Sequence, residues 1–429
     1  MIGSLLTVFC HPSNAYSSDQ AMMPAAREYT APARSERYRP RDTAGSLGYN
    51  ERMAGTNQPT RRDFLHGRAA AGLVGGVARA FADDRPTAPT DDTPAAGIGV
   101  GSVVKASRSL LASFRRRAMA CEFEVQVGTA DAGQSTESVL AALDLVEALE
   151  AQLTIYRDDS EVLCINRQAA DRPVAVEPRL FALLEMAARL HSETDGALDL
   201  TTGPLSDLWG FSRRQGRLPS ANEVAETIKR VGMEKVMLDA SAHTVSLRER
   251  GVSLHLNCIG KGFALDRMAE SLASASVEDY LLHGGRSSIL ARGRCPSSER
   301  PGWTIGLPHP LRPGERLGEI DLVDQALGTS GSATQSFEHK GRRYGHLLDP
   351  RTGRPVTGIY TATAIASSAA EADALSTAFY VMGPEKTARF CATRPDLGAI
   401  LVCPGDTADQ VRLSTYGLDG RRWRPVAAT

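Results

Sequence analysis

The sequence predicts an α+β domain with mixed sheets over residues 111–429. Segments with the two-residue alternation of strands are interleaved with segments of helical period. Several predicted strands are separated only by short turns, which disfavours a doubly wound parallel sheet.

The domain is predicted to begin with a strand and two helices. Residues 122–127 alternate as in a half-buried strand, and apolar residues then recur every three or four positions from Val139 to Leu153. A second helix begins near Pro178, and Gly196 stands where the C-cap of that helix is expected.

Short strands and two further helices follow. The predicted strand at residues 252–256 leads directly into Gly260-Lys261-Gly262, which opens a helix. Another helix is predicted at residues 371–382. The strands are expected at residues 235–238, 244–247, 252–256, 280–282, 303–307 and 360–365.

Residues 1–110 have a different composition, rich in Ala, Arg, Ser, Thr, Pro and Gly, and we expect a largely disordered arm. Within it, Arg61-Arg62 followed by Phe64-Leu65, a short apolar run and Ala80-Phe81-Ala82 resemble a twin-arginine export signal over residues 60–82. The alternative is a chance arginine pair. Export would place the protein in the periplasm, and otherwise it is expected in the cytoplasm.

The charge and hydropathy patterns exclude two broad classes of function. Lys+Arg number 49 and Asp+Glu number 50, so the chain lacks the basic excess typical of nucleic-acid binding. No apolar run reaches the roughly 18–20 residues that a membrane-spanning helix needs. Seven scattered cysteines form no C-x-x-C pair, which argues against a zinc site.

Two glycine-containing segments could bind an anion or end a helix. His255 to Gly262 joins a predicted strand to a helix through Gly-Lys-Gly, so free backbone N–H groups and the Lys261 cation suit a phosphate. An ordinary turn between a strand and a helix, which binds no phosphate, is an equally common interpretation. Thr194 to Asp199, with Trp209-Gly210-Phe211, is by itself more typical of a helix end and a turn.

Two further segments offer acid–base or metal chemistry. His346 and Asp349 lie in a stretch that continues as Pro350-Arg351-Thr352-Gly353 and are candidates for acid–base catalysis, although a single histidine is more often structural. Asp373 and Thr377 are four residues apart on a predicted helix, so both face one side. Their oxygen atoms suit Mg²⁺ better than Zn²⁺, whereas a helix-capping or surface pair is the alternative.

Together, the order and spacing of these motifs resemble the ApbE family of FAD:protein FMN transferases from about residue 117 to residue 402. The resemblance implies largely antiparallel mixed sheets flanked by helices, with an FAD cleft between two lobes. It also implies Mg²⁺-dependent transfer of FMN from FAD to a Ser or Thr hydroxyl of a target flavoprotein, with release of AMP. The motifs are residues 154–160, 194–199, 209–211, 259–262, 284–285, 329–331, 346–355 and 372–377.

The resemblance also implies roles for individual residues. Asp373, Thr377 and the backbone carbonyl of Cys258 would bind Mg²⁺. His346 would activate the acceptor hydroxyl, and Asp349 would shape its loop or orient it. The residues implied to contact FAD are Met119, Tyr156, Ala197, Leu198, Asp199, His255, Lys261 and Leu347.

Several positions depart from the family pattern, among them Ala120 where glycine is usual, His255 where an acid is frequent, and Cys258 where glycine or alanine is usual. Two alternatives therefore accompany FMN transfer. In the first, water replaces the acceptor and the protein is an FAD pyrophosphatase that yields FMN and AMP. In the second, the protein binds FAD without catalysis.

Overall fold

The computed structural model describes residues 7–8, 111–332, 335–420 and 422–426. The predicted export signal at residues 60–82 lies outside these residues and stays a prediction, as does the division of the chain at about residue 110. Thr7–Val8 form a short strand, β1, within the range expected to be disordered. None of the helices in the described ranges has the length and apolarity to cross a membrane.

An antiparallel sheet of eight strands is the centre of the domain. Its strand order is β18-β17-β16-β11-β8-β7-β3-β2, and every pair of neighbours is antiparallel. The predicted α+β class is therefore confirmed. The strands are β2 (Leu111–Ala118), β3 (Cys121–Gly128), β7 (Tyr280–Gly284), β8 (Ser288–Arg292), β11 (Ala326–Gly331), β16 (Thr361–Ala366), β17 (Gly398–Pro404) and β18 (Val411–Tyr416).

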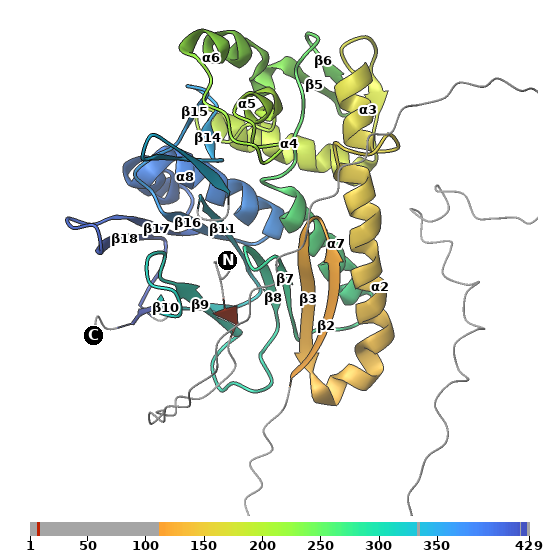
Figure 1. Ribbon diagram of the computed structural model, residues 1–429. Coiled ribbons are helices and arrows are strands. Elements are labelled where there is room, and N and C mark those ends of the chain that lie inside the picture. The colour runs from red at the N-terminus through yellow and green to blue at the C-terminus, as the bar shows by residue number, and fades with distance from the viewer. Residues whose placement is uncertain (1–6, 9–110, 333–334, 421, 427–429) are drawn as a thin grey trace, which may run out of the picture. The chain divides into compact units, whose positions relative to one another are not determined.

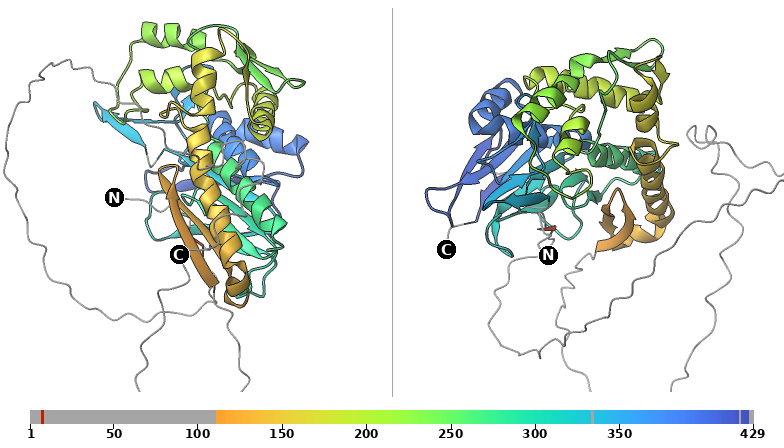
Figure 2. Two further views of the ribbon diagram at one scale, coloured as in Figure 1. Left: turned by 90° about the vertical axis from the view of Figure 1, so that its right-hand side faces the viewer. Right: turned by 45° about the horizontal axis from the view of Figure 1, so that its top comes forward.

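Three helices cover one face of this sheet (Figures 1 and 2). They are α2 (Thr129–Leu153), α7 (Gly260–Ser274) and α8 (Ala369–Thr393). The apolar stripe predicted from Val139 to Leu153 packs into the main core. Helix α8 bends at Gly383, where φ is +74°, so its first segment ends at the predicted residue 382. This layer brings the N-terminus of α7 beside the first turns of α8.

A smaller sheet, of strand order β1-β9-β10-β19, packs on the opposite face of the eight-stranded sheet. Its strands are β1, β9 (Trp303–Pro308), β10 (Arg316–Leu322) and β19 (Trp423–Pro425). Leu281 and Ile289 face this second core, while Tyr280 and Leu282 face the helices. The central strands β7, β8, β16 and β17 are buried on both faces because both faces are covered, whereas the edge strands β2 and β18 keep exposed residues.

A helical lobe, defined here as residues 160–247, lies above α8 in Figure 1. Its helices are α3 (Glu161–Gln168), α4 (Pro178–Glu193), α5 (Gly203–Leu208), α6 (Ala221–Thr227), η1 (Ile228–Arg230) and η2 (Met233–Lys235). Its small sheet has the order β4-β6-β5 and contains β4 (Val174–Ala175), β5 (Val236–Asp239) and β6 (Thr244–Leu247).

Two short hairpins complete the described part of the chain. The first pairs β12 (Ser336–His339) with β13 (Arg342–Gly345), and the second pairs β14 (Leu348–Asp349) with β15 (Arg354–Pro355).

The predicted strand at residues 252–256 is wrong, although this segment is buried at Val252 and Leu254. It pairs with no other strand. Instead the Asn166 side chain accepts from the Leu254 N–H at 2.7 Å and donates to the Leu254 carbonyl at 3.0 Å. An amide side chain thus satisfies the backbone as a neighbouring strand would, which an alternating pattern cannot reveal.

Candidate active site

A cavity of about 610 Å³ lies between the helical lobe and the layer formed by α7, α8 and the eight-stranded sheet. The helical lobe and the layer opposite it both contribute residues to the cavity wall. Eleven of the thirteen residues implied by the resemblance line it, namely Met119, Tyr156, Ala197, Asp199, His255, Cys258, Lys261, His346, Leu347, Asp373 and Thr377. The structure thus brings together side chains from six separate segments of the sequence.

Asp373 is buried, with its carboxylate at the floor of the cavity. Its Oδ2 accepts from the Gly262 N–H and from Ser288 Oγ, both at 2.8 Å. Its Oδ1 accepts no hydrogen bond from the described residues. Burial raises the pKa of Asp373, while Lys261 acts in the opposite sense. A cation beside Oδ1 would therefore stabilise the ionised carboxylate.

Thr377 lies one helical turn after Asp373 and lines the same cavity. Its Oγ1 is 3.0 Å from Ser330 Oγ, which in turn is 2.8 Å from Ser376 Oγ. Ser330 and Ser376 both lie within the motifs given above, but the sequence predicted no role for either of them. Their hydroxyls sit beside the predicted metal pair because β11 runs along the first turns of α8.

Cys258 also lines the cavity, directly before α7. Burial raises the pKa of its thiol to about 12, so sulfur stays protonated at neutral pH. The Gly262 N–H, four residues later, donates to Asp373 and not into the helix. A carbonyl oxygen, a carboxylate and a hydroxyl are hard donors, so this set fits Mg²⁺. No cluster of three His, Cys, Asp or Glu side chains suited to a metal occurs among the described residues.

Lys261 is the second residue of α7 and extends into the cavity. Its ammonium forms no ion pair with any described residue. The N-terminus of α7 adds the positive end of the helix dipole at the same place, although the N–H groups of Gly260 and Gly262 already donate to the Leu256 carbonyl and to Asp373. This end of the cavity is therefore suited to a phosphate group.

His346 is held in one orientation by the neck of the β12–β13 hairpin. Its Nδ1 lies 3.0 Å from the Gln335 carbonyl, and its ring meets Phe211 edge to face at 6.4 Å. Because a carbonyl only accepts, Nδ1 carries the proton and Nε2 keeps a free lone pair. Burial lowers the pKa of His346, although the hydrogen bond to Gln335 opposes this, so the imidazole is neutral at pH 7.

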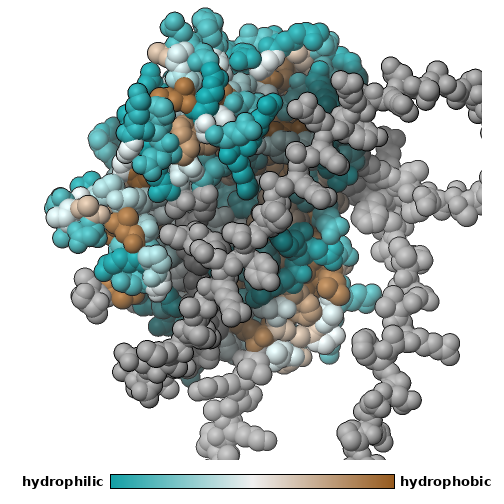
Figure 3. Space-filling view, in the orientation of Figure 1, coloured by the Kyte–Doolittle hydropathy of each residue, from teal (hydrophilic) through white to brown (hydrophobic). Residues whose placement is uncertain are grey.

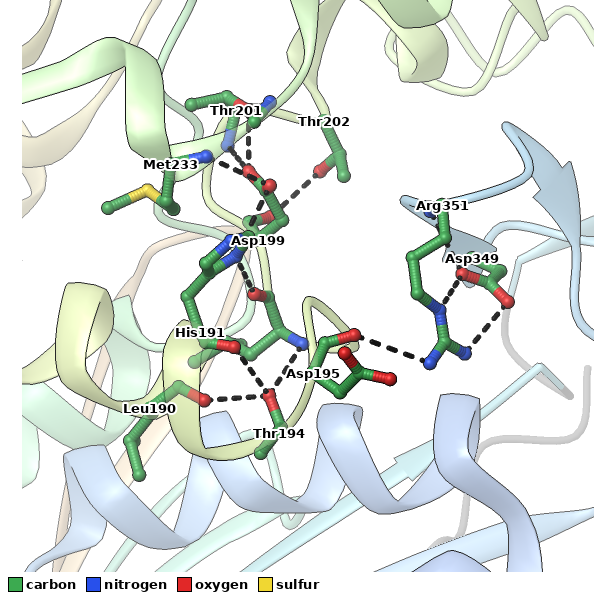
Figure 4. A network of polar contacts seen from close by, with 12 residues as sticks. Leu190, His191, Thr194, Asp195, Asp199, Thr201, Thr202, Met233, Asp349 and Arg351 are labelled. Carbon is green, nitrogen blue, oxygen red and sulfur yellow. Dashed lines mark hydrogen bonds and ion pairs between the residues drawn. The ribbon is translucent and has the colours of Figure 1, made fainter.

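Asp199 lines the cavity, but its carboxylate is engaged inside the lobe (Figure 4). It accepts from the Thr201 N–H at 2.7 Å and from the Met233 N–H at 3.2 Å, and it lies 3.4 Å from His191 Nδ1. Burial raises the pKa of Asp199 despite the hydrogen bonds from Thr201. The carboxylate thus holds the loop after α4 in place.

The two remaining implied residues are not brought to the cavity wall. Leu198 is buried in the main core. The Asp349 carboxylate pairs with Arg351 at 2.8 Å and accepts from the Arg351 N–H at 3.0 Å (Figure 4). The Asp349 carbonyl also accepts from the Gly353 N–H at 2.8 Å. Asp349 therefore shapes the turn between β14 and β15, while Gln335 orients His346.

The turn between β2 and β3 contributes Met119 to the cavity. Met119 and Ala120 have φ of +49° and +57°, the conformation of a two-residue type I′ hairpin. A positive φ is unfavourable for residues that carry a Cβ atom, so glycine is preferred at these positions. The turn is nevertheless formed with alanine at the position where the resemblance implies glycine.

His255 packs against α5 at the side of the cavity. A Cβ atom on Gly203 would lie 2.5 Å from the His255 ring, so only glycine permits this contact. Burial lowers the pKa of His255, while Asp207 opposes that change. With His255 neutral, Lys261 and Arg214 are the charged cations among the described residues that line the cavity.

Known proteins resemble this chain over most of the domain. The model of the ApbE family matches residues 119–401. The chain belongs to the ApbE family. An FAD:protein FMN transferase of Haemophilus influenzae is 32% identical over 266 residues, which cover 60% of this chain and 75% of the relative. One of Treponema pallidum is 31% identical over 61% of this chain and 75% of its own length.

Solved ApbE structures show the same fold. The ApbE protein of Thermotoga maritima has a TM-score of 0.63 and 28% identity, covering 71% of this chain and 97% of its own. The flavin transferase ApbE of Vibrio cholerae has a TM-score of 0.62 and 26% identity, covering 72% and 97%. The family, the fold and the enzyme class expected from the sequence are therefore confirmed.

Proposed function

We propose that this ApbE-family chain transfers FMN from FAD to a Ser or Thr hydroxyl of a target flavoprotein in a Mg²⁺-dependent reaction that releases AMP. The observation that carries this proposal is that Lys261, Asp373 and His346 line one cavity. A cation for phosphate, a donor set for Mg²⁺ and a neutral imidazole are the three groups that the reaction requires.

The pyrophosphate of FAD is assigned to the end of the cavity beside Lys261. The ammonium and the N-terminus of α7 offset the negative charge of the two phosphates. Met119, Tyr156 and Leu347 supply apolar wall for the ring systems, and Tyr156 is 74% exposed, so its ring is accessible to a ligand.

Asp373, Thr377 and the Cys258 carbonyl would hold the Mg²⁺ ion. A bound Mg²⁺ polarises phosphoryl oxygens and stabilises the charge that develops on the leaving phosphate. Ser288 and the Gly262 N–H occupy Oδ2 of Asp373 and so direct Oδ1 to the cavity. Ser330 holds the hydroxyl of Thr377.

His346 is proposed to accept the proton of the acceptor hydroxyl. The hydroxyl oxygen attacks the phosphorus of the FMN half, a new O–P bond forms, and the P–O bond to the AMP phosphate breaks. The hydroxyl proton moves to Nε2, and AMP leaves with the bridging oxygen. The fixed Nδ1 proton and the lowered pKa keep Nε2 available for this step at neutral pH.

Incubation with FAD, Mg²⁺ and a peptide that contains a single threonine tests the proposal by mass spectrometry. An FMN adduct on threonine together with an equal amount of AMP is expected, and a threonine-to-valine peptide is the control. Free FMN and AMP without an adduct would establish a pyrophosphatase. FAD retention without AMP would establish a binding protein. Either result would overturn the transferase assignment.

A further inference from the structure

We propose that a groove beside the active-site cavity, lined by Trp209, Leu218, Val224, Tyr344 and Pro355 and rimmed by Arg342 and Arg354, docks an acidic stretch of the acceptor protein that also carries an apolar side chain. This inference rests on the proposed transfer reaction, and it names how the acceptor is recognised. The groove has a volume of about 330 Å³ and is separate from the cavity that would hold FAD.

The groove shares a thin wall with the cavity. Tyr344 lines the groove, while His346, two residues later, lines the cavity. Across the β14–β15 hairpin, Leu348 on the cavity side is paired with Pro355 on the groove side. Two extended residues span about 7 Å, so a chain seated in the groove could place a neighbouring hydroxyl near His346.

Aromatic side chains make up the body of this wall. Phe337 stacks on Tyr344 at 5.2 Å, and Trp209 contacts both rings at 6.5 and 5.9 Å. Trp209 Nε1 also donates to the Gly353 carbonyl at 2.8 Å, which fixes the indole against the turn before β15. The floor of the groove is therefore rigid, as a recognition surface requires.

The chemistry of the groove selects the partner. Leu218 is 44% exposed, and apolar side chains appear between hydrophilic ones over α6 and the β14–β15 hairpin (Figure 3). An apolar side chain of the partner would cover this surface. No carboxylate is found among the described residues that line the groove.

The charge of the rim is unbalanced. Arg342 and Arg354 are exposed, and neither forms an ion pair with a described residue. Arg342 lies over the ring of Tyr344 at 5.3 Å, which holds the guanidinium at the edge of the groove. Asp349 pairs with Arg351 and Glu223 pairs with Arg217, so neither of these carboxylates neutralises the rim. Two unpaired guanidinium groups over an apolar floor are complementary to carboxylates flanking an apolar side chain.

Two short synthetic peptides test the proposal on the full-length protein. Both contain one threonine and one leucine, flanked by aspartates in the first peptide and by lysines in the second. Fluorescence anisotropy should show at least about tenfold tighter binding of the aspartate peptide, and this preference should decrease as salt is added. In an Arg342→Glu/Arg354→Glu variant the preference should reverse to the lysine peptide.

Arg412→Glu is the matched control, since Arg412 is exposed on β18 and does not line the groove. It should leave both peptide affinities unchanged, and both variants should retain FAD binding. Equal affinity for the two peptides, no binding of either, or the same loss in the Arg412→Glu control would overturn the docking surface.

Mass analysis of the same mixtures separates this inference from the transfer reaction. Peptide preference that reverses in the double variant without any FMN adduct would refute transfer and leave the docking surface standing. FMN adducts formed equally on both peptides, and unaffected by the double variant, would refute the docking surface and leave transfer standing.

Discussion

Asp373 Oδ2 accepts a 2.8 Å hydrogen bond from the backbone N–H of Gly262. This bond joins the start of α7, which carries Lys261, to the face of α8 that carries Thr377. A Cβ atom on Gly262 would lie 2.1 Å from the Ala369 carbonyl oxygen, so the two helices approach this closely only because glycine is present. The position of Lys261, which is proposed to bind phosphate, relative to the predicted metal site is therefore set by backbone packing.

Replacement of Asp373 by Asn should remove Mg²⁺-dependent turnover. The amide keeps an oxygen that can accept from Gly262 and Ser288, but it lacks the charge that binds the cation. We expect a fall in kcat of about 10²- to 10³-fold, comparable to the loss of a main electrostatic group in other enzymes. A Mg²⁺ titration of FAD turnover checks this, and a titration curve identical to that of the wild type would refute the metal assignment.

Replacement of His346 by Asn should slow FMN transfer by about 10²- to 10⁴-fold, the usual contribution of a general base. The affinity for FAD should change only a few-fold, because the side chain is assigned to the acceptor and not to the phosphates. Single-turnover transfer and equilibrium FAD binding measure the two effects. Equal losses in both would make His346 a binding residue.

The pH profile gives a second readout for His346. Burial lowers its pKa, so Nε2 is protonated only below the ordinary histidine value of 6.5. The wild-type transfer rate should therefore be level above about pH 6.5 and fall at lower pH. The residual rate of His346→Asn should lack this fall.

Replacement of Lys261 by Ala should weaken FAD binding by about 10- to 100-fold, because a charge-assisted contact to the pyrophosphate is lost. Riboflavin, which has no phosphate, should bind both proteins alike. Lys386→Ala is the control, since Lys386 is exposed and lies 3.9 Å from Asp195 outside the cavity. An unchanged FAD affinity in Lys261→Ala would place the pyrophosphate elsewhere.

Replacement of Asp266 by Ala should destabilise the protein by about 1–3 kcal/mol. Its two carboxylate oxygens accept from the Ala369 and Ala370 N–H groups at 2.8 and 2.9 Å, which fixes the N-terminus of α8. Denaturant unfolding measures the loss. A second readout is Mg²⁺ affinity, which should fall because α8 carries Asp373.

The ionisation of Asp266 should also make the free energy of unfolding depend on pH. Burial raises its pKa to about 6 from 3.8, so the folded state retains this proton more strongly. Its contribution to the free energy of unfolding is present at acid pH and is lost as the pH rises through 6. Asp266→Asn should remove this component, and a profile unchanged from the wild type would contradict the assignment.

Replacement of Ala120 by Gly should stabilise the protein by about 1 kcal/mol, because φ of Ala120 is +57° and glycine adopts this conformation without a Cβ clash. Ala275→Gly is the control, since φ is −95° at Ala275 and no gain is expected. Thermal unfolding compares the two variants. A loss of stability in Ala120→Gly would show that the methyl group packs favourably at the cavity.

The elements with strong periodicity could be predicted from the sequence. The helix inferred from the apolar residues between Val139 and Leu153 and the one that begins at Pro178 are confirmed, because their apolar stripes match the period of a helix and face one core. The sequence could not distinguish residues 252–256 from a strand. The backbone N–H and carbonyl of Leu254 are hydrogen-bonded by the side chain of Asn166, some ninety residues earlier, and not by a neighbouring strand. Local patterns record which residues are buried, but not which group satisfies the backbone.

The same division applies to the active site. The residue types and their order in the chain were enough to indicate the ApbE family, a cation for phosphate at Lys261 and an oxygen pair at Asp373 and Thr377. Only the tertiary structure decided that the Gln335 carbonyl orients His346. Only the structure showed that the Asp349 carboxylate pairs with Arg351 in the turn between β14 and β15. Chemistry resides in residue types, which are written in the sequence, whereas orientation depends on hydrogen bonds between segments that meet only when the chain folds.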